Sequence, residues 1–508
     1  MGLFEPQTPK LEVKCEVNVL LVNPNCGFQT YIKSAPLGLL SIATYLKQRG
    51  CDMRLYDRKI EKTSPAKAVR NFRPDAVGVC VASVADINDG VRISRWFRRR
   101  GIPVVWGGQF SSLVPEMILR EGSADYVVIE EGEITFFELM RALENKGDLA
   151  QVQGIAYLES GGFHRTLARE FADLADLPVI DWSLIDPPKY FFPDAELDRK
   201  KALCLYSSKG CSGRCAFCYN KDFHHSQCRR RPNEYVLREM EELSKKHGMD
   251  GVFFVDDDMF GEKSPEELRD FCESLRALNL GINWRCFTRA TRLRREELEL
   301  LHSAGCRRFF CGVESGSPEI LRRMRKRDDL ARLEGSIRDC NENGIAVTCG
   351  FVLGFPGETQ AQLRETAQLM KRLDAWPNRL QILMHFPFPG SDTYNELVEG
   401  GRLNPPKTLR EWGKYKLRED IFDNEFNVPA KDMHVLQAYF GWRGVFRKAD
   451  VHAKRETARS TLGSSLQGIL QQNFFTMIRF IFSSAKYFLT IAWYAHAYPG
   501  ILKKYGLD

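Results

Sequence analysis

The chain has 508 residues, more than a single hydrophobic core usually contains, so we expect two or three domains. Its composition, 44% hydrophobic and 27% charged, is typical of a soluble globular protein. A net charge of +7, from 73 basic and 66 acidic side chains, is too small an excess to indicate a nucleic-acid partner.

The N-terminus lacks the basic and then apolar pattern of a secretory signal. Most of the fifteen cysteines lie singly in apolar segments, where a buried thiol is the ordinary interpretation. We therefore expect a reducing, cytoplasmic environment, in which clustered cysteines bind metal more often than they form disulfides.

Residues 15–145 alternate short apolar runs with helical patterns. The run at 18–24 predicts a strand, and 36–50 predicts a helix with Pro36 at its start and Gly50 just past its end. Further strands are expected at 52–57, 76–83, 103–108 and 126–133. Runs that stay apolar favour a parallel sheet covered on both faces. We expect an open, doubly wound α/β domain whose ligand edge lies at the carboxyl ends of the strands.

Residues 146–200 are rich in Pro and Asp and are expected to be a linker. Residues 201–395 repeat the strand and helix pattern with longer helices, which predicts a partial (β/α)6 TIM-type barrel. Its six strand candidates are 201–208, 251–257, 283–289, 307–315, 345–355 and 379–386. In such a barrel the chemistry takes place at the carboxyl ends of the strands.

Residues 396–508 lose the strand pattern and are expected to be mainly helical. The stretch 473–506 is apolar and aromatic, but Arg479 and Lys486 interrupt it before it reaches the roughly 18 uncharged residues of a spanning helix. A helix packed on the barrel is one interpretation. A membrane-surface helix, giving peripheral membrane contact, or a cap over a hydrophobic substrate are the others.

Three cysteines, Cys211, Cys215 and Cys218, lie in the polar, glycine-rich loop 209-KGCSGRCAFCYN-220 directly after the first barrel strand. A structural zinc site usually takes pairs of cysteines from two separate segments, and here only Cys204 and Cys228 flank the loop, so zinc stays as an alternative. A [4Fe–4S] cluster needs four iron ligands, so three thiolates leave one iron open to a small molecule.

The C-x3-C-x2-C spacing, with Phe217 before the last cysteine, resembles the radical S-adenosylmethionine superfamily. There the amino and carboxylate groups of S-adenosylmethionine chelate the open iron. The resemblance implies that the cofactor is also contacted from later strand ends, by Asp256, Asp257, Arg289, Glu314, Gly350 and Gly354. The aspartates would lie beside the methionine amino group, Arg289 would hold its carboxylate, Glu314 the ribose, and the glycines the adenine. The acidic residues could equally cap the next helices, and Arg289 could form a surface salt bridge.

A doubly wound domain ahead of such a barrel resembles the cobalamin-binding-domain radical enzymes, which include class B radical methylases and anaerobic magnesium-protoporphyrin ester cyclases. The resemblance implies that cobalamin contacts Ser83, Gly107, Gly108, Gln109, Glu131 and Gly132. It covers residues 17–395.

One motif departs from the classical cobalamin fold, D-x-H-x-x-G, whose histidine binds cobalt. This chain has 57-DRKIEK-62, with Lys59 in the place of the histidine and Lys62 in the place of the glycine. A protonated amine cannot ligate a metal. A degenerate domain that only supports the barrel is therefore an alternative.

The resemblance implies a mechanism in which the reduced cluster cleaves S-adenosylmethionine, the resulting radical removes a substrate hydrogen, and cobalamin delivers a methyl group. We predict an enzyme, a cobalamin-dependent methyltransferase acting on an unactivated carbon of a hydrophobic small molecule such as an isoprenoid, lipid or tetrapyrrole. An external donor such as flavodoxin or ferredoxin would supply electrons. A radical oxidative cyclase, or another non-methylating reaction, is the first alternative. A non-catalytic sensor or electron-transfer protein is the second.

Two further features bear on nucleotides and nucleic acids. No P-loop motif occurs, and the basic run at 228–234 is more typical of a solvated face, or of a lid near an anionic cofactor, than of an RNA site. His224 and His225 are expected in an exposed loop or in a substrate pocket. We do not expect a nucleic-acid partner.

Overall fold

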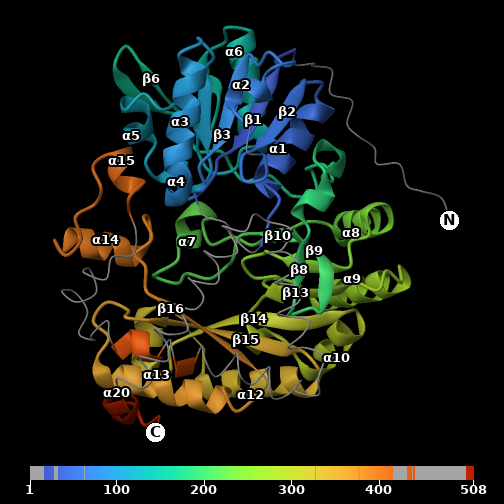
Figure 1. The fold of residues 1–508 in the computed structure, drawn as a ribbon, viewed down its shortest axis with the longest axis vertical. Helices are drawn as coiled ribbons and strands as arrows, with labels where there is room; N and C mark the ends of the chain where they lie inside the picture. Colours follow the sequence, from blue (N-terminus) through green and yellow to red (C-terminus); the bar gives the residue numbers. More distant parts are fainter. Residues whose placement is uncertain are drawn as a thin grey trace, which may run out of the picture. The chain divides into compact units, whose positions relative to one another are not determined.

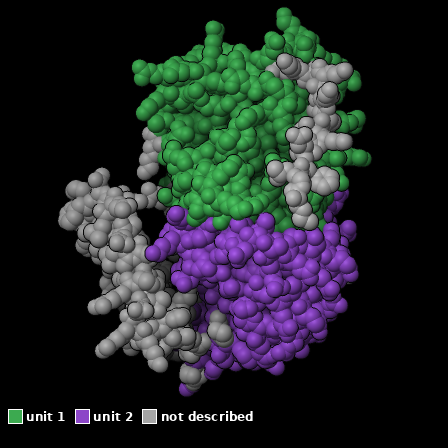
Figure 2. Space-filling view, turned by 90° about the vertical axis from the view of Figure 1, so that its right-hand side faces the viewer, with its two compact units in different colours: residues 1–192, 229–248, 404–416 green, residues 193–228, 249–403, 417–508 purple. Residues whose placement is uncertain are grey.

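The computed structural model describes residues 16–27, 32–61, 63–326, 328–376, 378–415, 432–436, 439–440 and 499–507. The chain divides into two compact units, each drawn from separate stretches of sequence (Figure 2). Unit 1 comprises residues 1–192, 229–248 and 404–416, and unit 2 comprises residues 193–228, 249–403 and 417–508. Most of the apolar stretch, residues 473–498, lies outside the described residues.

Unit 1 is built on a seven-stranded sheet with the order β2-β1-β3-β4-β5-β6-β7 (Figure 1). Its strands are β1 Val19–Asn23, β2 Met53–Asp57, β3 Ala76–Cys80, β4 Val104–Gly107, β5 Tyr126–Val128, β6 Ile155–Glu159 and β7 Gly162–Arg165. The first five strands are parallel, and β6 and β7 add an antiparallel hairpin. The predicted doubly wound α/β fold is confirmed. Residues 146–200, expected to be a linker, supply the hairpin.

Helices cover both faces of this sheet. Helices α1 Leu37–Gln48 and α6 Glu133–Glu144 share one hydrophobic core with inward side chains of the strands. Helix α3 Ile87–Arg98 contacts the opposite face, where the indole of the fully buried Trp106 donates a hydrogen bond to Ser94 Oγ at 2.7 Å. The remaining elements of unit 1 are α2 Pro65–Ala68, η1 Val84–Asp86, α4 Gln109–Leu113, α5 Pro115–Arg120, η2 Leu149–Gln151, η3 Trp182–Leu184, η4 Pro187–Tyr190, β11 Arg229–Arg230, α8 Asn233–His247 and α15 Leu409–Trp412.

Unit 2 carries the second large sheet, with the order β16-β15-β14-β13-β12-β9-β8. The strands of this sheet are β8 Phe192–Asp194, β9 Arg199–Leu205, β12 Gly251–Phe254, β13 Asn283–Phe287, β14 Cys306–Glu314, β15 Ala346–Leu353 and β16 Arg379–Met384. Unit 2 also contains the short strand β10 Ser208–Lys209, which is not part of this sheet. The six strands from β9 to β16 in this sheet are parallel and neighbour one another in chain order, so the predicted partial (β/α)6 barrel is confirmed.

The helices of unit 2 alternate with these strands (Figure 1). They are α7 Asn220–Phe223, α9 Pro265–Ala277, η5 Ala290–Arg292, α10 Arg295–Ser303, α11 Pro318–Arg323, α12 Leu330–Glu342, α13 Gln360–Leu373, α14 Asp392–Glu399 and α20 Pro499–Lys504. Helix α9 begins with a capping box, in which Ser264 and Glu267 satisfy each other's backbone N–H groups. The cap of α9 is therefore supplied by Ser264 and Glu267, not by the aspartates at 256 and 257.

The last described residues pack onto the barrel helix α13. Tyr505 is fully buried and donates a hydrogen bond to Asp432 at 2.7 Å. Its backbone carbonyl accepts one from Gln368 of α13 at 2.7 Å. Among the described helices, none combines the length and the hydropathy needed to cross a membrane.

Candidate functional site: a cysteine loop in unit 2 and a glycine-rich sheet edge in unit 1

The three clustered cysteines lie on the loop after β9, the first parallel strand of unit 2. Gly210 begins this loop with a φ of +80°, and a Cβ there would lie 2.1 Å from the carbonyl oxygen of Gln227. Within the loop, the Cys218 N–H donates to the Cys215 carbonyl at 3.1 Å, and the Gly213 N–H donates to Cys211 Sγ at 3.3 Å. The backbone thus folds tightly enough to gather the three thiols.

The surroundings of these thiols suit a metal cluster. Burial raises the pKa of Cys211, Cys215 and Cys218, the last to about 12, and the two neighbouring thiols add to the rise at Cys218. Iron binding would therefore displace protons from them. The guanidinium of Arg289 lies 3.9 Å from Cys215 Sγ, where a cation offsets thiolate charge.

Within the described part of the chain, no set of three or more His, Cys, Asp or Glu side chains gathers as a single metal ion requires. In a cubane cluster, by contrast, each thiolate binds a different iron. Three gathered, partly buried thiols beside a cation fit a [4Fe–4S] cluster.

The predicted aspartates after β12 differ in their partners. Asp256 is 1% exposed, and its carboxylate accepts hydrogen bonds from Ser207 N–H at 2.9 Å, Ser207 Oγ at 2.7 Å and Ser208 Oγ at 2.6 Å. Asp256 thus ties the end of β9 to β12. Burial raises the pKa of Asp257, while hydrogen bonds from Asn220 and the Gly210 N–H lower it, so its carboxylate faces the cysteine loop.

Asp258 was not singled out from the sequence, although it continues the same acidic run. It is buried, and it accepts a hydrogen bond from Thr288 Oγ1 at 3.2 Å. It also forms an ion pair with Arg292 at 3.3 Å. It connects the loops after β12 and β13.

Glu314 lies at the carboxyl end of β14 and has a φ of +65°. Its Oε1 pairs with the ammonium group of Lys326 at 2.9 Å, so its carboxylate does not cap α11. Lys326 was missed from the sequence because one lysine in the basic stretch 322–327 carries no distinguishing pattern.

The two predicted glycines belong to β15 and the loop that follows it. A Cβ on Gly350 would lie 3.0 Å from the ring of Phe310. Gly354 has a φ of +74°, and its N–H donates to Glu358 Oε2 at 2.7 Å. Glu358 is 1% exposed, and this burial raises its pKa to about 7.

In unit 1, the residues predicted to contact cobalamin follow the carboxyl ends of β3, β4 and β5, which form one edge of the parallel sheet. They are Ser83, Gly107, Gly108, Gln109, Glu131 and Gly132. Two glycines there have no room for a side chain. Gly108 has a φ of +102° and its Cβ would lie 3.0 Å from the Val81 carbonyl oxygen, while a Cβ on Gly132 would lie 2.7 Å from Ile42. Glycine at these two positions lets the loops pack closely against neighbouring parts of unit 1.

The motif that departs from the cobalamin pattern lies at this edge as well. Asp57 is buried and accepts hydrogen bonds from Asn23 at 3.0 Å, Tyr190 at 3.0 Å and the Lys59 N–H at 2.9 Å. The Lys59 ammonium lies 3.5 Å from one carboxylate oxygen of Asp86. The other oxygen of Asp86 accepts a hydrogen bond from the Ser83 N–H. Lys59 is thus held by a carboxylate as a cation, and it offers no metal ligand.

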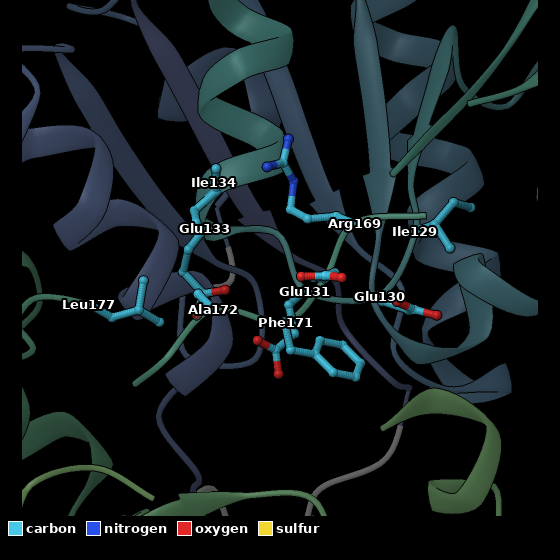
Figure 3. A pocket seen from close by; sticks show the side chains of 10 residues that line it. Ile129, Glu130, Glu131, Glu133, Ile134, Arg169, Phe171, Ala172 and Leu177 are labelled. Atoms are coloured by element: carbon cyan, nitrogen blue, oxygen red, sulfur yellow. The ribbon is translucent and has the colours of Figure 1, made fainter. Parts of the chain in front are cut away.

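Glu131 is held within unit 1 instead of being presented to solvent. Its carboxylate pairs with Arg229, whose guanidinium stacks on Phe171 at 4.4 Å and donates to the Ala172 carbonyl at 2.8 Å. Around these groups the segments 129–134 and 169–177 line a small pocket (Figure 3). Its volume of about 20 Å³ has room for roughly one water molecule and none for a corrin ring.

The basic run 228–234 is therefore used internally. Arg231 is 6% exposed and pairs with the buried Glu239, which also accepts a hydrogen bond from the Ile180 N–H at 3.1 Å. The interpretation of this run as a solvated face is wrong for Arg229 and Arg231. His224, expected in an exposed loop or in a substrate pocket, is buried against Phe223, so it is not an exposed loop residue.

Two family models match the chain, one over part of each of its two large sheets. The B12 binding domain matches residues 31–140, and the Radical SAM superfamily matches residues 205–370. An uncharacterized methyltransferase of Pyrococcus horikoshii is 26% identical over 75% of this chain and 81% of its own length. The anaerobic magnesium-protoporphyrin IX monomethyl ester cyclase of Rubrivivax gelatinosus is 27% identical over 75% and 70%.

Two further proteins are similar over more of the fold. The hopanoid C-3 methylase of Methylococcus capsulatus is 24% identical over 90% of this chain and 85% of its own length. The radical S-adenosylmethionine methyltransferase TsrM of Kitasatospora setae, solved with cobalamin and a [4Fe–4S] cluster, has a TM-score of 0.66 at 20% identity, over 76% of this chain and 75% of that one. These matches confirm the predicted pairing of domains: the chain is a radical S-adenosylmethionine enzyme of the group that carries a B12-binding domain.

Proposed function

We propose that this enzyme methylates an unactivated carbon of a hydrophobic small molecule, using a [4Fe–4S] cluster, S-adenosylmethionine and cobalamin. The observation that carries the proposal is that one chain combines a three-cysteine loop at the first strand of an open barrel with a complete B12-type sheet. Relatives named as methyltransferases or methylases share both parts.

In unit 2 the binding roles follow from the side chains that remain available. Cys211, Cys215 and Cys218 would hold three irons of the cluster. Arg289, already beside Cys215, would take the methionine carboxylate, and Asp257 would take the amino group. Asp256 is engaged by three donors, so we assign it the role of holding the loop that Asp257 faces.

Further along the same sheet, Glu314 would accept hydrogen bonds from the ribose hydroxyls, and Gly350 and Gly354 would let the backbone approach the adenine. When bound, the three cofactors supply electron transfer, a carbon-centred radical and a transferable methyl group.

In unit 1, the backbone of Gly107, Gly108 and Gly132 would hold the corrin ring, with Ser83 and Gln109 adding side-chain contacts. Lys59, paired with Asp86, would leave the cobalt without a protein ligand on that side. Glu131 is committed to Arg229, so we assign it the role of shaping the loop.

The proposal of a hydrophobic substrate is supported by how much of this chain the match to the hopanoid C-3 methylase covers. The match to the hopanoid C-3 methylase leaves a tenth of this chain uncovered, whereas residues 396–508 make up more than a fifth. The similarity therefore extends into residues 396–508, the C-terminal region that also contains the apolar stretch 473–506. A polycyclic lipid or another isoprenoid is the substrate type that this region would suit.

A radical oxidative cyclisation is the second candidate, favoured by the similarity to magnesium-protoporphyrin ester cyclases over 75% of the chain. The two reactions differ in product mass, because methylation adds one CH2 unit and cyclisation removes hydrogen. A single mass measurement on the product distinguishes them.

The test uses the full chain, expressed anaerobically with cobalamin, reconstituted with iron and sulfide, and assayed with a low-potential reductant such as dithionite or reduced flavodoxin. We expect about one cobalamin per chain, and transfer of label from methyl-labelled S-adenosylmethionine into a total isoprenoid lipid extract. Deoxyadenosine and S-adenosylhomocysteine should form together with the labelled product. Intact iron–sulfur absorbance with no bound cobalamin would refute cobalamin-dependent methylation. Bound cobalamin with an unlabelled product that has lost hydrogen would favour the cyclase.

A further inference from the structure

We propose that the turn from Met324 to Lys326 is a positioning element, and that Lys326 aims the Glu314 carboxylate at the ribose of S-adenosylmethionine. The proposal rests on the proposed function, because it assumes that Glu314 contacts this cofactor. Lys326 would touch neither the substrate nor the reacting atoms.

The backbone fixes where the Lys326 side chain begins. Helix α11 ends in a left-handed residue, Arg325, with a φ of +56°. The Lys326 N–H returns to the Leu321 carbonyl at 2.9 Å, which is the hydrogen bond that closes a Schellman-type helix end. In the same turn, the Met324 carbonyl accepts the Ala216 N–H at 2.9 Å. Ala216 lies between two of the clustered cysteines, so one turn contacts both the cysteine loop and the Glu314 carboxylate.

The Lys326 side chain then locks Glu314. Its ammonium, 6% exposed, donates to Glu314 Oε1 at 2.9 Å and to the Gly312 carbonyl at 2.6 Å. Burial alone would lower the pKa of Lys326, but the Glu314 carboxylate raises it, so the lysine stays charged. Within the described residues, Lys326 is the one side-chain partner of Glu314. The carboxylate is therefore held at Oε1, while Oε2 has no protein donor there and can accept from a ribose hydroxyl.

The strand is shaped to permit this arrangement. The pairing of β14 with β15 shifts register between Gly312 and Glu314, and Glu314 adopts a φ of +65°, which a residue with a side chain rarely does. A Cβ on Gly312 would lie 2.1 Å from Glu314 Oε1 and 2.9 Å from Lys326 Nζ. Backbone strain of this kind is retained where the surrounding structure enforces it, often at a binding site.

The test compares S-adenosylmethionine affinities of the anaerobically reconstituted full chain by equilibrium dialysis, with iron content and thermal unfolding as checks. We expect Lys326→Met and Glu314→Gln each to weaken binding about 10- to 100-fold, the range for losing a charged hydrogen bond. The double variant should bind about as weakly as either single variant, because both changes remove one interaction. Lys246→Met, an exposed lysine on α8, should bind like wild type.

Gly312→Ala keeps both charges and tests the geometry by itself. The atoms that its Cβ would meet are the ends of two flexible side chains, so the fold should survive while the pair is displaced. We expect at least 10-fold weaker binding at unchanged iron content. This variant decides the matter if Lys326→Met does not fold.

Wild-type affinity in Gly312→Ala or Lys326→Met would overturn the positioning role. So would a double variant whose loss is the product of the two single losses. If the wild-type chain itself binds no S-adenosylmethionine, the proposed function fails instead.

Discussion

The two sheets of this enzyme hold their ligand-edge loops by different means. In unit 2 the loops at the strand ends are fixed by buried charged side chains. Asp256 holds the end of β9, Lys326 holds Glu314, and Glu358 holds the turn after β15. In unit 1 the corresponding loops combine glycine backbone, at Gly108 and Gly132, with ion pairs such as Glu131–Arg229 and Lys59–Asp86.

This contrast indicates which motifs can be transferred from one protein to another by residue identity. A side chain that binds a cofactor or fixes a loop must keep its chemical type, so the barrel positions could be proposed from residue identity. A loop that offers backbone to a ligand needs only the conformation, and its charged neighbours can take other tasks. Glu131, singled out for cobalamin, pairs with Arg229, and Lys59 pairs with Asp86.

We expect the largest effect from removing a cysteine from the loop in unit 2. Cys218→Ala should lose most of the iron and all cleavage of S-adenosylmethionine, because two thiolates cannot hold the cluster. Iron content and the cluster absorbance measure this. Its cobalamin content should stay at the wild-type value, since unit 1 is untouched.

Cys228→Ala is the matched control, and it also tests the zinc alternative. The Cys228 thiol donates a weak hydrogen bond to the Gly261 carbonyl at 3.5 Å and lies outside the three-cysteine spacing. We expect full iron content and no bound zinc. Iron loss equal to that of Cys218→Ala would show that Cys228 is a fourth ligand.

Both fold types could be predicted from the sequence because each parallel strand is a short apolar run followed by a helix pattern. The β6–β7 hairpin was missed, although Ser160-Gly161-Gly162 between AYLE and FHRT is a turn signal between two short runs. The Pro and Asp residues in the rest of the segment led to the prediction that all of 146–200 is a linker.

The candidate site could be predicted only where residues lie within one motif. The three cysteines fall within eight residues, and loop geometry brings them together. Lys326 and Glu314 are twelve residues apart, and Arg229 and Glu131 are 98 apart, so their pairing depends on tertiary structure that no local spacing encodes. The basic run was misjudged for the same reason, because the partners of its arginines lie in other segments.

A substitution at Gly108 tests whether the loop after β4 in unit 1 requires the backbone conformation of glycine. Gly108→Ala forces a left-handed backbone onto alanine and puts its Cβ 3.0 Å from the Val81 carbonyl oxygen. We expect it to destabilise unit 1 by about 3 kcal/mol, combining backbone strain with overpacking, and to lower cobalamin content. Chemical unfolding and cobalamin extraction measure both effects.

The neighbouring glycine supplies the control. A Cβ on Gly107 would meet its nearest atom, of Val128, at 3.8 Å, an ordinary contact. Gly107→Ala should therefore change stability by less than about 1 kcal/mol. If both variants bind cobalamin as wild type does, the ligand does not approach this backbone.

Glu358 tests whether a buried carboxyl holds the turn after β15, through the dependence of stability on pH. Burial raises its pKa from 4.5 to about 7, so the folded state binds a proton that the unfolded chain has released between these pH values. The contribution of Glu358 to stability therefore falls as pH rises through this window and is constant above it. By linkage the loss amounts to about 2 kcal/mol between pH 5 and pH 7. Glu358→Gln, which resembles the protonated acid, should show a correspondingly flatter profile in anaerobic urea unfolding. Equal slopes for wild type and variant would mean that this carboxyl titrates normally, and that the turn at Gly354 is held by its backbone, as the loop at Gly108 in unit 1 is.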